Sequence, residues 1–476
     1  MHLPDGLIAV VKRDCPTCQL TAPVLASIHE AGVPLVVYSQ DDPSFPSGVT
    51  VVDDSPLEVS FDLGIEIVPT LIQVADGKPL RRVEGWVRQD WQALTGLREL
   101  GTDLPALRPG CGSLSVEPGI AERLAVRFGT TRLTSRQVDL GELEDDLEAC
   151  FDRGWTDGLP VVPPTAERVL RMLEGTARSK DEVVAVVPPD LAACTVEKVA
   201  INAVLAGCKP EYLPVVLAAV EAACTDEFNM HGVLATTHFV GPVVIVNGPI
   251  AREIDMNSGV NALGQGNRAN ATIGRALQLV IRNVGGGRPG GVDRATLGNP
   301  GKYTFCFAED EVGSPWESLA SERGIESATR GAVSLFAGEG LRGVVDQLSR
   351  TPESLARSFA ACLRTVAHPK LFGRWDALVV ISPEHARTFR QAGWSKPQVR
   401  SRLLELLTVP AEELVRDVDG IAEGMPTSSD GALTKFSPGG LWLVHAGGQA
   451  GMFSAIIGGW SGGPGGSQLV TREVGP

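Results

Sequence analysis

The feature that most constrains the fold is a cysteine pair, Cys15 and Cys18, placed between a short apolar run and a helical pattern. Residues 6–11 (GLIAVV) predict a buried strand. After the cysteines, apolar residues recur at helical spacing, at Leu20, Val24 and Ile28. Cys15 is therefore expected at a helix N-terminus, where unpaired N–H groups and the helix dipole stabilise a thiolate.

The residues that follow predict further strands and helices at short intervals. Residues 33–39 predict a strand, and residues 55–65 predict a helix with Ser55 as its N-cap. Residues 68–86 predict a hairpin with its turn at Asp76-Gly77, and residues 88–100 predict a closing helix. The predicted order is β-α-β-α-β-β-α.

Residues 6–100 resemble the thioredoxin superfamily. The resemblance depends on Cys-Pro-Thr-Cys at 15–18, on Val-Pro-Thr at 68–70 and on Glu-Gly-Trp at 84–86, although Asp14 stands where the family has tryptophan. The resemblance implies that Cys15 is the attacking thiol and Cys18 the resolving thiol. It also implies that Pro69 follows a cis peptide bond and lies against the cysteine pair. A structural cysteine pair or half of a zinc site is the alternative, but a zinc site needs two more ligands and the chain has no second CxxC.

Composition excludes some classes of protein. Hydrophobic residues make up 43% and charged residues 21% of the 476 residues, which is typical of a globular chain with more than one domain. The net charge of −15 argues against a non-specific nucleic-acid binder. No apolar run is long enough for a membrane span, and the first residues lack a signal-peptide pattern. We expect a cytoplasmic protein without nucleic-acid or membrane partners.

The chain is expected to divide into three parts: a dithiol domain at 1–100, a connector at 101–150 and a large domain at 151–476. Residues 104–119 are dense in proline, glycine and serine, which is typical of a loop. Cys111 lies between two glycines of this loop, where it is either a linker residue or a relay that carries electrons between domains on a flexible tether.

The large domain is predicted to be α/β with a mostly parallel or mixed sheet, because short apolar runs alternate with helical patterns. The expected strands cover residues 182–188, 242–248, 303–309, 332–338, 376–382 and 441–448. The expected helices cover residues 195–206, 210–224, 268–283, 352–365, 384–392, 396–407 and 411–422. Ligands of such sheets gather at the carboxyl ends of strands. The glycine-rich run 445–455 is expected to form a strand-to-helix turn near a ligand.

Cys208 is the candidate reactive thiol of the large domain. It precedes Lys209-Pro210-Glu211, which predicts a helix start, and both a helix N-terminus and a lysine lower a thiol pKa. Cys194 is a weaker candidate for the same reason. A buried core position is the alternative for both, as it is for the other cysteines of this domain, Cys224, Cys306 and Cys362.

Two further constellations could carry chemistry. Gly264 and Gly266 precede a helical pattern that contains Arg268 and Arg275, which predicts a site for an anionic substrate at a helix start. The alternative is an ordinary capping loop. His231 and His238 are candidates for a metal site or for general acid/base catalysis, although no HExxH pattern is present.

Three functions remain open. The leading hypothesis is a thiol-dependent oxidoreductase, a reductase or reductive lyase, in which Cys208 attacks a small anionic molecule and Cys15 and Cys18 recycle it. No bound cofactor is expected, and NADPH would act only through an external thiol reductase. The second hypothesis is a metal- or acid/base-dependent enzyme with the dithiol domain as a redox switch. The third is a non-enzymatic binding protein with a redox sensor.

Overall fold

The computed structural model describes residues 3–141, 143–325, 330–369, 371–411, 414, 431–461 and 465–475. The chain forms two compact units, Met1–Leu133 and Thr134–Pro476. The boundary lies inside the expected connector. Within the described residues, no helix combines the length and the apolar character needed to cross a membrane.

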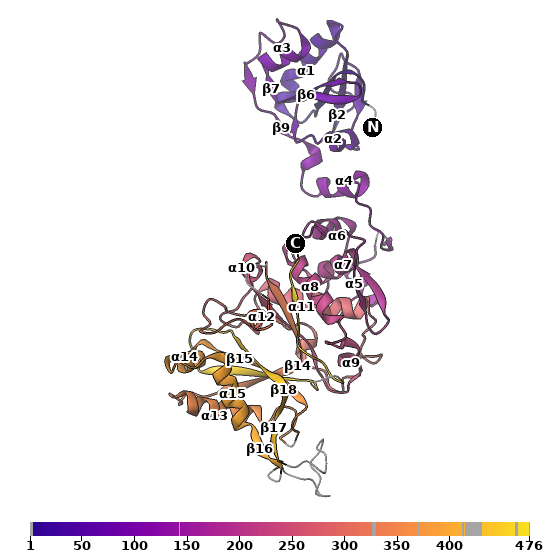
Figure 1. Cartoon of the computed structure of the whole chain (residues 1–476). Coiled ribbons are helices and arrows are strands. Elements are labelled where there is room, and N and C mark those ends of the chain that lie inside the picture. The colour runs from indigo at the N-terminus through magenta and orange to yellow at the C-terminus, as the bar shows by residue number, and fades with distance from the viewer. Residues whose placement is uncertain are drawn as a thin grey trace. The chain divides into compact units, whose positions relative to one another are not determined.

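The N-terminal unit alternates short strands and helices (Figure 1). Its strands are β1 (Gly6–Val11), β2 (Leu35–Ser39), β3 (Val51–Asp53), β4 (Ile67–Val68), β5 (Thr70–Ala75), β6 (Lys78–Glu84), β7 (Trp86–Val87), β8 (Leu107–Arg108) and β9 (Cys111–Gly112). Its helices are α1 (Pro16–Glu30), α2 (Glu58–Asp62), α3 (Arg88–Thr95), the 3-10 helix η1 (Leu114–Val116) and α4 (Ile120–Phe128).

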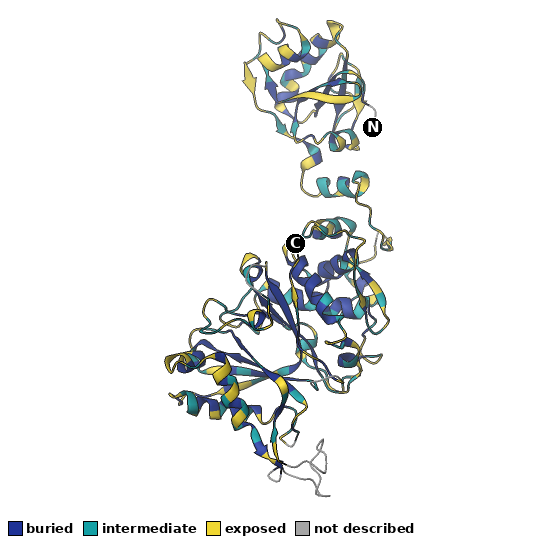
Figure 2. Ribbon diagram, viewed as in Figure 1, coloured by how far each residue is buried: buried dark blue, intermediate teal, exposed yellow. Residues whose placement is uncertain are grey.

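The central sheet of this unit is mixed, with strand order β3-β2-β1-β5-β6. Strand β1 pairs in parallel with β2 and antiparallel with β5, so it is covered on both edges. Strand β6 is exposed along most of its length, as Figure 2 shows. The predicted hairpin turn is confirmed, because Asp76 and Gly77 both have positive φ, the conformation of the tight turn that joins β5 to β6.

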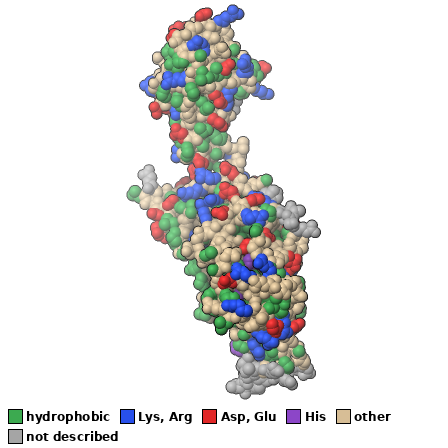
Figure 3. Space-filling view, turned by 90° about the vertical axis from the view of Figure 1, so that its left-hand side faces the viewer, with side chains coloured by type: hydrophobic (Ala, Val, Ile, Leu, Met, Phe, Trp, Pro, Cys, Tyr) green, Lys and Arg blue, Asp and Glu red, His purple; other side chains and the backbone are tan. Residues whose placement is uncertain are grey.

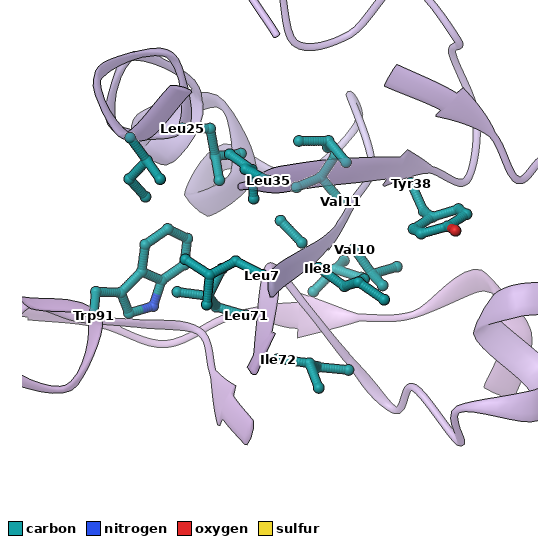
Figure 4. Packing of buried hydrophobic residues seen from close by; sticks show 14 of the residues in the cluster. Leu7, Ile8, Val10, Val11, Leu25, Leu35, Tyr38, Leu71, Ile72 and Trp91 are labelled. Atoms are coloured by element: carbon teal, nitrogen blue, oxygen red, sulfur yellow. The ribbon is translucent and has the colours of Figure 1, made fainter. Parts of the chain in front are cut away.

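Strand β1 is buried on both faces because its alternate side chains enter two apolar layers. Leu7 points toward Leu25 of α1 and Trp91 of α3, whereas Ile8 and Val10 lie on the other side (Figure 4). Burial of such side chains, each contributing on the order of 2 kcal/mol, holds the strand that ends just before Cys15.

Two local expectations for this unit need correction. Helix α2 does not begin at Ser55: its N-cap is Leu57, and the Asp54 carboxylate accepts the N–H groups of Val59 and Ser60, each at 3.0 Å. Strands β8 and β9 of the expected connector pair with β7 and β4, so this part of the connector extends the N-terminal unit.

The large unit, Thr134–Pro476, is built around one mixed sheet. Its strands are β10 (Val183–Val187), β11 (Ala192–Thr195), β12 (Gly241–Asn247), β13 (Cys306–Ala308), β14 (Ala332–Val345), β15 (Trp375–Ile381), β16 (Thr408–Pro410), β17 (Ala432–Thr434), β18 (Phe436–His445), β19 (Phe453–Gly459) and β20 (Val470–Glu473). Its helices are α5 (Asp146–Asp152), α6 (Ala166–Leu173), α7 (Val196–Ala206), η2 (Pro210–Tyr212), α8 (Leu213–Ala223), α9 (Met230–Ala235), α10 (Pro249–Glu253), α11 (Arg268–Asn283), η3 (Pro300–Lys302), α12 (Leu319–Glu322), α13 (Pro352–Leu363), α14 (Pro383–Gln391) and α15 (Lys396–Leu406).

The main sheet has the order β13-β12-β14-β19-β15-β18, and β20 pairs with β14. The pairs β12–β13 and β15–β18 are parallel, and the other pairs are antiparallel, so the α/β class with a mixed sheet is confirmed. Apolar residues of α13, α14 and α15 pack on β15, β18 and β19, and these helices gather beside those strands in Figure 1.

Three expectations for the large unit differ from the structure. Strand β10 belongs to a separate two-stranded sheet with β11 and is only partly buried, with Val183 and Val186 exposed, so its apolar run does not mark a fully buried strand. The glycine-rich run after β18 leads into a strand, β19, and not into a helix. The expected helix at 411–422 lies almost entirely outside the described residues.

Candidate functional site

Cys15 is the N-cap residue of α1. Its backbone is extended, with φ −143° and ψ 115°, and its sulfur accepts the Cys18 N–H at a distance of 3.3 Å. Pro16 occupies the first helical turn, where its missing N–H removes no intrahelical bond. The expected placement of Cys15 at a helix N-terminus is confirmed.

Cys111 lies at the same site. Strand β9 pairs antiparallel with β4 in the register Val68↔Cys111, and the Cys111 and Cys15 sulfur atoms are 2.8 Å apart. This separation is longer than the ~2.05 Å of a disulfide, and all nine cysteines are free thiols. The expectation that Cys111 lies on a flexible tether is wrong, because backbone pairing fixes its position within the N-terminal unit.

Close backbone approach explains why β9 reaches the cysteine pair. A side chain at Gly110 would place its Cβ 2.6 Å from the Val68 carbonyl oxygen and 2.4 Å from Ile67, so glycine allows this contact. Thr17 Oγ1 donates to the Pro109 carbonyl at 2.7 Å and ties the same loop to the first turn of α1. Two independent contacts therefore hold the segment that precedes Cys111.

The Val68–Pro69 peptide bond is cis, as the family resemblance implied. The carbonyl oxygen of Val68 lies 3.5 Å from the Cys15 sulfur. Val68 therefore contacts both β9, through strand pairing, and the Cys15 sulfur, through its carbonyl oxygen.

The pKa values of Cys15, Cys18 and Cys111 are shifted in different directions by their surroundings. The pKa of Cys15 is lowered to about 5, and the hydrogen bond from the Cys18 thiol is the largest cause. Hydrogen bonds from Cys111 and from backbone N–H groups also lower this pKa, whereas burial raises it. Burial raises the pKa of Cys18, and the neighbouring Cys15 raises it further. Burial and Cys15 also raise the pKa of Cys111. At neutral pH the site therefore holds one thiolate, Cys15, between two thiols.

Solvent reaches these sulfurs unequally. Cys15 and Cys18 are both 0% exposed, whereas Cys111 is partly exposed. Cys111 therefore covers the nucleophilic sulfur on the side where the chain is open to solvent.

Cys208 does not fit the role expected for it. It follows the C-cap of α7 and is buried, and its sulfur lies 3.4 Å from the Thr272 carbonyl oxygen. Burial raises the pKa of Cys208 to about 12, where a lowered pKa was expected. The expected helix start is confirmed, because η2 begins at Pro210 and continues directly into α8. Burial of the Cys208 thiol nevertheless outweighs the effect of the helix start and of the adjacent Lys209.

The other cysteines of the large unit resemble Cys208. Burial raises the pKa of Cys194 and of Cys224 to about 12 each. Burial also raises the pKa of Cys150, Cys306 and Cys362. The pKa of Cys15 is lowered, whereas the pKa of each of these other cysteines is raised. Cys15 is therefore the cysteine that favours the thiolate at neutral pH.

The predicted anion site is largely occupied by the protein itself. Arg275 donates from Nε and Nη2 to the two carboxylate oxygens of Asp157, at 2.8 Å each, and from Nη2 to the carbonyls of Leu159 and Pro160. Burial on its own would raise the pKa of Asp157, but Arg275 lowers it. Arg275 is therefore a structural residue, because its charge is already neutralised.

The remaining residues of that prediction, Gly264, Gly266 and Arg268, differ in their surroundings. Arg268 is exposed at the start of α11, and its Nε donates to the Gly207 carbonyl at 2.9 Å. Gly266 is exposed, and only Gly264 lines a cavity. On the face shown in Figure 3, acidic and basic side chains are interspersed. An anionic substrate therefore stays a prediction, and Arg275 is not free to bind it because it is paired with Asp157.

The two candidate histidines do not converge. His231 is exposed on α9, whereas His238 Nε2 lies 3.5 Å from Glu339 Oε2 and its ring meets Trp375 edge-on. Within the residues that the structure describes, no group of three or more His, Cys, Asp or Glu side chains is placed to hold a metal ion.

The sequence predicted a ligand near the run 445–455, and much of this run lines a cavity at the carboxyl ends of β15 and β18, together with Gly264. Ser382 and Ser454 were not singled out as polar groups of this site. These parallel strands end side by side at Ile381 and His445, and a cavity of about 420 Å³ opens there. Its lining includes Ser382 and Ser454. The general rule on strand ends, with Ser-Pro at 382–383 and the glycines after 445, was the available signal.

Beneath this cavity, the Ser454 hydroxyl is 2.7 Å from His385 Nδ1. His385 Nε2 lies 3.1 Å from the Asp346 carbonyl oxygen, which can only accept, so Nε2 carries the proton and Nδ1 accepts from Ser454. Burial lowers the pKa of His385 and keeps it neutral at pH 7. The pair fixes the orientation of the Ser454 hydroxyl at the cavity wall.

No family model and no curated protein matches this chain. The site is therefore interpreted from its own geometry.

Cys15 should alkylate with the pH profile of an acidic thiol. We expect the rate with iodoacetamide to rise through about pH 5 and to level off by about pH 7, because the thiolate is the reacting form. Replacing Cys18 with alanine should move the midpoint upward, since the Cys18 thiol contributes most to the lowered pKa. Mass spectrometry of the Cys15 peptide measures the rate, and Cys362 provides a control thiol. A rate that still increases steeply above pH 8 would contradict the assignment.

Arg275→Ala should lower the stability of the large unit by about 2 kcal/mol, between the values for exposed and buried ion pairs, because it leaves the half-buried Asp157 carboxylate without its partner. Arg268→Ala should change stability by less than about 0.5 kcal/mol, since Arg268 is exposed. Hydrogen exchange of α11 peptides in increasing urea measures the stability of each variant in the full chain. Equal losses in the two variants would show that the Asp157 pair does not stabilise the fold.

Proposed function

We propose that this protein is a thiol–disulfide oxidoreductase whose N-terminal unit is a member of the thioredoxin superfamily. The observation that carries the proposal is the Cys15 sulfur, which caps α1, has its pKa lowered to about 5 and lies beside a second buried thiol. The strand order and the position of Cys15 at the start of α1 support the family resemblance.

In the forward reaction, the Cys15 thiolate attacks one sulfur of a disulfide substrate. A mixed disulfide forms on Cys15, and the other half of the substrate leaves as a thiolate. Cys18 then gives up its proton and attacks the Cys15 sulfur, which releases the second half. Two protein thiols become one disulfide, and one substrate disulfide becomes two thiols.

Cys18 is suited to the second step and not to the first. Its raised pKa keeps it a thiol while Cys15 carries the negative charge. Once Cys15 is part of a mixed disulfide, that charge is gone, so deprotonation of Cys18 costs less. An external thiol reductase that draws on NADPH would return two electrons to the oxidised pair.

Cys208 has no part in this proposal. Its buried thiol with a pKa of about 12 is a poor nucleophile at neutral pH. Self-recycling of a large-unit thiol therefore loses its candidate residue, and the disulfide substrate is supplied from outside the large unit.

Cys15→Ser should reduce disulfide exchange by the full chain to the rate seen without protein, because serine is a far weaker nucleophile than a thiolate. Reduction of insulin by dithiothreitol measures this. The matched control is Cys208→Ser, which should keep the wild-type rate. Activity that survives in Cys15→Ser would remove the N-terminal unit as the source of the chemistry.

The cavity at the ends of β15 and β18 favours a second candidate function, the binding of a small polar molecule by the large unit. Its volume of about 420 Å³ is typical of small-molecule sites, and Ser382 and Ser454 are polar residues of its lining.

A screen of small polar metabolites by thermal shift on the full chain tests this second function. A ligand of this cavity should stabilise wild type and the control Ser401→Ala, which changes an exposed residue of α15. The same ligand should give a smaller shift in Ser382→Ala, because one hydroxyl of the cavity wall is lost. Equal shifts in all three proteins would place the ligand elsewhere.

A further inference from the structure

The dithiol site contains a third sulfur that the two-cysteine reaction does not use. We infer that Cys111 is a second resolving cysteine, so that Cys15 forms a disulfide with either Cys18 or Cys111. This inference rests on the proposed thiol–disulfide exchange at Cys15 and adds a route by which that exchange is completed.

The distance between sulfurs is the first support. The Cys111 sulfur is 2.8 Å from the Cys15 sulfur, close enough that a bond can form with little movement of either side chain. The two residues are 96 positions apart in sequence, so their proximity comes entirely from the fold.

The framework around Cys111 is the second support. Residues on both sides of it are fixed: Pro109 by Thr17 Oγ1, and Ser113 by its N–H to the Glu66 carbonyl at 2.8 Å. The buried Gln40 side chain also donates to Ser113 Oγ at 2.6 Å. A strand held at both ends presents its thiol to Cys15 in one defined position, as a resolving group requires.

The difference in exposure between the two candidate resolving thiols is the third support. Cys18 is fully buried behind Cys15, whereas Cys111 is partly exposed. A bulky group attached to Cys15 must therefore lie on the Cys111 side of the sulfur. Cys111 is then next to the bond that has to be broken.

The reaction balances as an ordinary exchange. After Cys15 has attacked a disulfide substrate, Cys111 loses its proton and its sulfur attacks the Cys15 sulfur. The Cys15–Cys111 bond forms, the bond from Cys15 to the substrate breaks, and the substrate half leaves as a thiolate that takes up the proton. The oxidant is the disulfide substrate itself. Cys18 can then attack Cys15 and free Cys111, which leaves the Cys15–Cys18 disulfide.

The test uses the reduced full chain, oxidised glutathione as the disulfide and mass spectrometry after rapid alkylation of free thiols. The proteins compared are wild type, Cys18→Ser, Cys18→Ala and the double variant Cys18→Ser/Cys111→Ser. Cys362→Ser serves as a control, because it changes a partly exposed cysteine of the large unit. Each sample is followed for the glutathione adduct on Cys15 and for linked peptides.

In Cys18→Ser and Cys18→Ala we expect a Cys15–Cys111 linked peptide. The glutathione adduct should disappear at least about a hundredfold faster than in the double variant, because the adjacent thiol acts at a high effective concentration. Cys362→Ser should behave as wild type. The two substitutions at Cys18 guard against a folding defect caused by one of them.

The inference is overturned if the Cys18 variants retain glutathione on Cys15 as long as the double variant does and give no Cys15–Cys111 peptide. That result would leave the proposed function intact, provided that wild type forms the Cys15–Cys18 disulfide. A wild-type protein that never acquires glutathione or a disulfide at Cys15 would instead overturn the proposed function itself.

Discussion

The 3.3 Å hydrogen bond from the Cys18 N–H to the Cys15 sulfur links the fold of the N-terminal unit to its chemistry. It exists because β1 is buried on both faces and delivers Cys15 to the N-cap of α1. At that position, an anionic sulfur satisfies backbone N–H groups that the helix leaves unpaired. The same geometry that begins the helix therefore favours the thiolate over the thiol.

The three-cysteine arrangement resolves a conflict between acidity and protection. A sulfur that is ionised at neutral pH is open to unwanted oxidation when it is exposed. Here the ionised sulfur is covered, and the thiol that covers it has a raised pKa. Charge and exposure are thus assigned to different residues, which is possible only because β9 crosses the site beside Val68.

The large unit shows how far burial can reverse an expectation based on neighbours in sequence. Lys209 follows Cys208 directly, yet the thiol is enclosed by apolar residues and its pKa rises to about 12. Arg275 follows a glycine-led helix start, yet its guanidinium pairs with Asp157, 118 residues earlier. In both cases the desolvation or the ion pair comes from segments distant in sequence, and these effects exceed those of the local motif.

The sequence by itself determined the features that depend on local pattern. Helix α1, the turn at Asp76-Gly77, helices α7 and α11, and the strands that became β12 and β15 were predictable, because caps, turn residues and apolar periodicity act over a few residues. The placement of Cys15 at a helix start belongs to this group. The partial exposure of β10, the contact between Ser454 and His385 beneath the cavity and the contact of Cys111 with Cys15 were decided by tertiary structure alone. Each of these depends on which strands pair and which faces are covered, and those pairings join residues far apart in the chain, beyond the reach of any local pattern.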